Sequence, residues 1–257
     1  MANKKTGGTA KNAPGASKYS KTKKASKTIN SEVAMLLQTV SDAPVLTFKQ
    51  RKSAAKLFEL AVLAELLYKY RESGGHVELR HAHGVCAKFA GSPASIDRTK
   101  FAWFELRRSP TAVDVYAEAW VSVQFNGLSG ARAVEAAAAF GPCLPLELRP
   151  SRHELDITIL SPGLATPYPS RMDIIAAVTV KHVSTLTKEA VREALGFRRE
   201  MGLLSPEQPS QCSWLELDVP SEPPSPLYLV SSAAKFEAYV GHIHQLGIYA
   251  GFMKFPY

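Results

Sequence analysis

One acidic residue lies on the apolar face of the most regular helical segment in this sequence. Glu59 shares that face with residues at helical spacing, namely Ala55, Val62, Leu63, Leu66 and Tyr70. A carboxylate among core side chains costs several kcal/mol unless something pairs with it. Glu59 therefore needs a partner, which could be a metal ion, a hydrogen-bond cluster or a buried arginine such as Arg198.

Two strand-like segments place further polar side chains at defined positions. In HELDITIL, Glu154 and Asp156 share one face because side chains alternate along a strand. In AAVTVKHV, Thr179 and Lys181 share a face at the end of an apolar strand. A lysine in that place is commonly a solvated edge residue. Beside an acidic strand, its ammonium could instead orient a water or stabilise the charge of a transition state.

Apolar periodicity predicts the elements that carry these residues. Helices are expected over 49–73, 131–140, 187–201 and 233–246, and strands over 76–81, 85–90, 101–107, 113–125, 153–160, 174–181 and 227–230. The Pro-rich segment 161–171 is expected to be a loop, and a Pro- and Ser-rich stretch covers 205–226. This succession predicts an α/β fold with a mixed sheet between helices.

The order of these elements resembles the PD-(D/E)xK, or restriction-endonuclease-like, nuclease superfamily. It runs from a glutamate-bearing helix through a β-meander to a strand ending in ELD, a strand ending in x-x-K and a covering helix. Prokaryotic members have segments similar to FELAVLAELL, to Leu128-Ser129-Gly130 upstream of HELDI, and to EALGFRREMG. The resemblance spans residues 48–246 and implies a restriction-endonuclease-like central mixed sheet flanked by helices.

The resemblance also implies roles for three residues. Asp156 matches the metal-binding aspartate, Lys181 the lysine of the motif, and Glu59 the helix glutamate that can assist the metal. In an active enzyme, Asp156 and Glu59 would hold Mg²⁺ or Mn²⁺, the metal would activate water and stabilise the scissile phosphate, and Lys181 would position the nucleophile. The implied function is a metal-dependent nuclease, with DNA favoured over RNA as its substrate.

Thr179 departs from the superfamily's pattern, which has a carboxylate two residues before the lysine. A threonine hydroxyl has no charge to offset a divalent cation. Three explanations stay open. The acid has moved to another position, for which the candidates are Glu154, Glu189 and Glu193. Alternatively, Glu59 and Asp156 hold the metal loosely with waters, or the site is inactive and the protein is a pseudonuclease that binds nucleic acid or serves in assembly.

The excess positive charge of the chain is concentrated at its N-terminus. Eight of the 31 Lys and Arg residues lie within residues 1–30, which leaves 23 against 23 Asp and Glu in the rest of the chain. Lysines among small and polar residues predict a disordered tail. Such a tail binds nucleic acid electrostatically, here through Lys18, Lys21, Lys23, Lys24 and Lys27. A solubilising arm or a targeting leader without a partner is the alternative.

Length and composition set the remaining expectations. A chain of 257 residues, 46% of them hydrophobic, can form a core, and we expect one domain over residues 31–257. The sequence has no long apolar run and no apolar signal core, so it predicts a cytoplasmic protein without a membrane span. Three widely spaced cysteines give no disulfide framework and no zinc motif. Nucleic acid is the expected partner, and a homo-oligomer or a protein partner is compatible with the sequence.

Overall fold

The computed structural model describes residues 30–43, 47–48, 53–81, 86–140, 152–234 and 237–255. The tail lysines named above, and the disorder expected of them, lie outside these residues. No helix within the described ranges is both long and apolar enough to cross a membrane.

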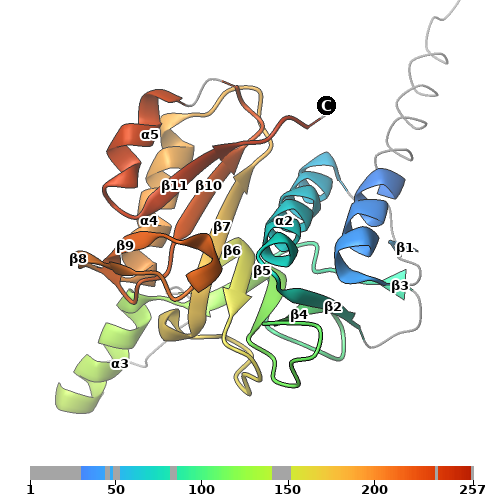
Figure 1. The fold of residues 1–257 in the computed structure, drawn as a ribbon. Coiled ribbons are helices and arrows are strands. Elements are labelled where there is room, and N and C mark those ends of the chain that lie inside the picture. Colours follow the sequence, from blue (N-terminus) through green and yellow to red (C-terminus); the bar gives the residue numbers. More distant parts are fainter. Residues whose placement is uncertain are drawn as a thin grey trace, which may run out of the picture.

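A mixed seven-stranded sheet forms the centre of the fold (Figure 1). Its strands lie in the order β11 (Ile248–Phe252), β10 (Leu227–Ser231), β7 (Ile174–Lys181), β6 (Arg152–Leu160), β5 (Ala117–Asn126), β4 (Trp103–Arg107) and β2 (His76–Arg80). Strands β11, β10 and β7 are parallel, and all other neighbours are antiparallel. Two small sheets pair β1 (Thr47–Phe48) with β3 (Cys86–Ala87), and β8 (Leu203–Pro209) with β9 (Asp218–Glu222).

Helices cover both faces of the large sheet, as Figure 1 shows. On one face, α2 (Ala54–Glu72) and a helix over residues 30–41 bury apolar side chains in a core that includes Ile157 and Val178 of the sheet. On the other face, α4 (Lys188–Met201) and α5 (Glu237–His244) pack on a second core with Leu155 and Leu229. Helix α3 (Leu128–Phe140) projects from the body, with most of its described side chains exposed. The expected α/β architecture with a mixed sheet is therefore present.

Helix α2 begins at Ala54, whereas the sequence predicts a start at residue 49. Ser53 stops the helix from extending further back, because its backbone is extended and its side chain accepts a hydrogen bond from the N–H of Lys56. The helix ends where Gly74 takes a φ of +94°, a conformation that favours glycine. Residues 49–52 lie outside the described part of the chain.

Other predictions differ from the structure at identifiable places. The strand expected from residue 113 starts at Ala117, because residues 109–112 form a turn before Tyr116 donates to the carbonyl of Leu106. The Pro- and Ser-rich stretch contains most of the β8–β9 hairpin, and a short 3₁₀ helix (Ser213–Leu215) lies between its two strands. A second short 3₁₀ helix (Arg171–Asp173) precedes β7. Strand β11 and the helix over 30–41 were not predicted, and α5 is shorter than expected. The strand predicted over 174–181 has those bounds.

Candidate functional site

Asp156 lies where strands β6 and β7 part. Their paired residues run from Leu160 to Ile157 on β6, and Ile157 is opposite Val178. At the next residue, the Asp156 side chain bonds to β7 in place of the backbone. Its Oδ2 accepts from the N–H of Val180 at 2.6 Å and from the Thr179 hydroxyl at 3.3 Å. The acidic strand and the lysine-bearing strand are therefore neighbours in the sheet.

Helix α2 brings a lysine as well as the expected glutamate to this end of the sheet. The Nζ of Lys56 lies 2.5 Å from Oε2 of Glu59, one turn later on the same helix, and 2.6 Å from Oγ of Ser122 on β5. The Lys56 and Glu59 side chains are 6% and 16% exposed. The buried partner that Glu59 requires is therefore Lys56, which sequence reasoning missed.

Arg198, which the sequence offers as a partner for a buried acid, lies on α4 in the other layer and contacts no carboxylate that the structure describes. It is 4% exposed, and its Nη1 donates to the carbonyl of Ser225 at 2.6 Å. Burial lowers the pKa of Arg198 to about 10. It bonds the backbone before β10, and its suggested pairing with a buried acid is wrong for the residues that the structure describes.

Ser122 connects the helix to the acidic strand. Its φ of +54° lies in the left-handed region that non-glycine residues rarely adopt, and its carbonyl accepts from the N–H of Ala94. Its hydroxyl accepts from Lys56, and its interaction with Glu154 lowers the pKa of that carboxylate. Hydrogen bonds thus join Glu59, Lys56 and Ser122.

The three carboxylates of this cluster act on one another electrostatically. Burial raises the pKa of Glu59, and the charges of Asp156 and Glu154 raise it further, against the lowering effect of Lys56. Burial likewise is the main cause that raises the pKa of Glu154 and of Asp156, and Lys56 and Lys181 lower both. Glu59, Glu154 and Asp156 therefore lie within electrostatic reach of one another.

Lys181 lies at the opposite side of this cluster, at the end of β7. Its Nζ is 2.7 Å from Oε2 of Glu193 on α4, and the two side chains are 20% and 47% exposed. Of the helix acids considered as a displaced ligand, Glu193 thus reaches the lysine of the motif. Glu189, by contrast, interacts with its own backbone and with Thr187 at the start of α4.

These side chains, as they lie, do not fit a divalent cation. Mg²⁺ requires several oxygen ligands in near-octahedral geometry, usually with carboxylates among them. Within the described ranges, no three His, Cys, Asp or Glu side chains are grouped closely enough to hold a metal ion. Glu59 is bonded to the Lys56 ammonium, and Asp156 Oδ2 to the backbone of β7. Thr179, whose hydroxyl donates to Asp156, is fully buried and neutral.

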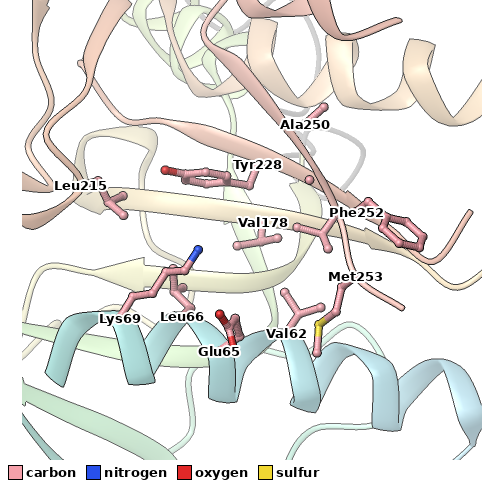
Figure 2. Close-up of a pocket in the computed structure, with 12 residues that line it drawn as sticks. Val62, Glu65, Leu66, Lys69, Val178, Leu215, Tyr228, Ala250, Phe252 and Met253 are labelled. Atoms are coloured by element: carbon pink, nitrogen blue, oxygen red, sulfur yellow. The ribbon is translucent and has the colours of Figure 1, made fainter. Parts of the chain in front are cut away.

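A separate groove of about 370 Å³ lies further along α2, between that helix and the β10–β11 edge (Figure 2). Figure 2 shows Val62 and Leu66 of α2 facing Val178 and Met253, with Lys69 at one end. Its lining is largely apolar, and none of the catalytic or metal-binding residues predicted from the sequence lines it. The groove and the carboxylate cluster are therefore separate features of the same helix.

Comparison of this chain with protein-family models, with curated proteins and with solved structures found no match.

Proposed function

We propose that this chain is a nuclease-derived protein of the PD-(D/E)xK type that binds nucleic acid without metal-dependent cleavage. The observation that carries the proposal is the source of positive charge in the cluster. A lysine ammonium, Lys56, lies against Glu59 and Ser122, and a neutral threonine stands where the superfamily has its second acid. A site neutralised in this way has lost the charge that would attract a divalent cation.

The order and adjacency of the elements support the nuclease-derived part of this proposal. Helix α2 with Glu59, strand β6 with Asp156, strand β7 with Lys181 and helix α4 follow one another along the chain, in the order on which the resemblance rests. Strands β5, β6 and β7 are neighbours in the sheet, and α2 packs over them. Glu59 and Asp156 thereby come within electrostatic reach of each other.

Exposed basic residues support the nucleic-acid-binding part. On α4, Lys188, Arg192 and Arg199 are exposed and, at spacings of four and seven residues, lie along one side of the helix. The predicted tail lysines would add sequence-independent attraction to phosphates. Together, the predicted tail and α4 would provide two sets of cations for a polyanionic backbone.

The experiment is a combined binding and cleavage assay on the full chain. Plasmid, duplex DNA, single-stranded DNA and RNA are each incubated with the protein in Mg²⁺ or Mn²⁺, alongside Asp156→Asn. We expect binding that weakens with salt and no cleavage by either protein. Metal-dependent cleavage that Asp156→Asn abolishes would contradict the proposal, whereas equal cleavage by both proteins would reveal a contaminating nuclease, and the assay would then be repeated on further-purified protein.

A metal-dependent nuclease with a displaced acid is the second candidate, and one observation favours it. Glu193 Oε2 lies 2.7 Å from Lys181 Nζ, so an acid from α4 reaches the lysine of the motif. In this alternative, Glu193→Gln abolishes cleavage while Glu189→Gln, an exposed acid one turn earlier, leaves it unchanged. Cleavage that survives Glu193→Gln would exclude Glu193 as the displaced acid.

A further inference from the structure

Lys56 occupies a position that is unusual for a lysine. It is 5% exposed, on the face of α2 that packs against the sheet, and its ammonium is in hydrogen-bond contact with Glu59 and Ser122. Removing an ammonium from water is costly unless its charge and its donors are satisfied. Here the carboxylate satisfies the charge, and the serine hydroxyl accepts a second hydrogen bond.

Ser122, which accepts a hydrogen bond from this ammonium, has an unusual backbone conformation. A left-handed φ at a serine within a strand is unfavourable relative to ordinary geometry, so surrounding contacts must hold it in place. Its hydroxyl accepts from Lys56, and Glu154 shares a strand face with Asp156. One buried ammonium thus contacts Glu59 directly, and its charge also lowers the pKa of Glu154 and Asp156.

The second lysine of the site makes its ion pair elsewhere. Lys181 pairs with Glu193 at the end of β7, both side chains are more exposed than Lys56, and from there its charge lowers the pKa of Asp156 and Glu154. The ammonium that pairs with the buried Glu59 is therefore the one that α2 supplies.

We infer that Lys56 is the built-in cation of this site: its ammonium takes the place and supplies the charge that a bound divalent cation would otherwise have among Glu59, Glu154 and Asp156. This inference deepens the proposed function and rests on it for the origin of the carboxylate cluster. It assigns the loss of metal binding to two features together, the ammonium of Lys56 and the neutral side chain of Thr179.

The test removes the charge and keeps the apolar stem. In the full chain, Lys56→Met leaves the three carboxylates without their buried cation, and Mn²⁺ is the probe. We expect Mn²⁺ to raise the Tm of Lys56→Met and to give a saturable calorimetric titration, with neither effect in the wild type. Adding Asp156→Asn to Lys56→Met should abolish both effects.

A matched control is available on the surface. Lys100 also pairs with an acid three residues away, with its Nζ 2.8 Å from Oδ2 of Asp97, but its side chain is 66% exposed. Lys100→Met should therefore respond to Mn²⁺ as the wild type does. If Lys56→Met folds only when Mn²⁺ is present, that rescue supports the inference, and failure to fold in both buffers contradicts it.

Two results would overturn the inference without contradicting the proposed function. One is a saturable Mn²⁺ site in the wild type that Asp156→Asn removes although no nucleic acid is cleaved. The other is a folded Lys56→Met protein that gains no Mn²⁺ binding. Conversely, metal-dependent cleavage by the wild type contradicts the proposed function, whatever Lys56→Met does.

Discussion

At the scale of single residues, the cluster around Lys56 sets how stability depends on pH. Glu59, Glu154 and Asp156 have raised pKa values, so the folded state binds protons more tightly than the unfolded chain does. In the unfolded chain the pKa is near 4.5 for the two glutamates and near 3.8 for the aspartate. The stability contributed by these protons is present below those values and is lost as the pH rises through the raised folded pKa values. Ionising these three carboxylates therefore lowers the free energy of unfolding.

Lys56→Met should make this loss larger, because Lys56 lowers all three pKa values. Denaturant unfolding should show the variant about 3 kcal/mol less stable than the wild type at neutral pH, with a smaller difference near about pH 4. Lys100→Met should differ little from the wild type at either pH. A deficit for Lys56→Met that is the same at all pH values would contradict this electrostatic explanation.

Ser122 gives a second prediction, because its φ favours glycine while its hydroxyl is needed. Ser122→Ala keeps the strained backbone and leaves the buried Lys56 ammonium short of a hydrogen bond, which should cost about 2 kcal/mol. Ser122→Gly loses the same bond but relieves the backbone, so it should be about 1 kcal/mol less destabilising than the alanine variant. Urea unfolding of both variants measures this difference, and a glycine variant that is the less stable of the two would refute it.

Glu59 and Asp156 could be found from the sequence, whereas Lys56 and Ser122 could not. An acid in an apolar stripe attracts attention because its burial is costly, and alternation places Glu154 and Asp156 on one face. A lysine in a helix usually extends its ammonium into water, and only its spacing of three residues from Glu59 signals the pair. Nothing in the letters around Ser122 indicates its positive φ.

At the scale of elements, prediction succeeded where burial alone decides the structure. Strand β7 is apolar along its length and lies within the sheet, so its bounds follow from its composition. The β8–β9 hairpin contains Pro206, Pro209 and Pro220, which are typical of loops. Strand β11 is five residues long and includes Gly251, and it forms by pairing with β10 at the sheet edge. Such edge pairings depend on contacts that local sequence does not reveal.

Helix α4 carries the prediction that belongs to this scale. If its exposed basic side contacts phosphates, Arg192→Ala combined with Arg199→Ala should weaken binding to duplex DNA. The slope of log K against log salt should fall by about 0.9 for each phosphate that the variant no longer neutralises. Arg132→Ala on α3 is the control, because Arg132 is also exposed and pairs only with the nearby Glu135 among the contacts that the structure describes. Equal binding by the α4 variant and the control would exclude this side of α4 as the interface.

At the scale of the whole molecule, the charge is divided between a basic tail and a neutral body. Deleting residues 2–29 should weaken nucleic-acid binding and reduce its salt dependence, again by about 0.9 in slope per phosphate that the tail neutralises. A chain of the same length with Lys18, Lys21, Lys23, Lys24 and Lys27 replaced by glutamine separates charge from length. An unchanged slope in both proteins would assign binding to the body alone.

The most direct measurement is anomalous diffraction from crystals of the wild type and of Lys56→Met soaked in Mn²⁺. The built-in cation account predicts no manganese peak among Glu59, Glu154 and Asp156 in the wild type, with the Lys56 ammonium between Glu59 and Ser122. It predicts a peak among these carboxylates in Lys56→Met. Manganese bound there in the wild type, with Lys56 displaced, would contradict it.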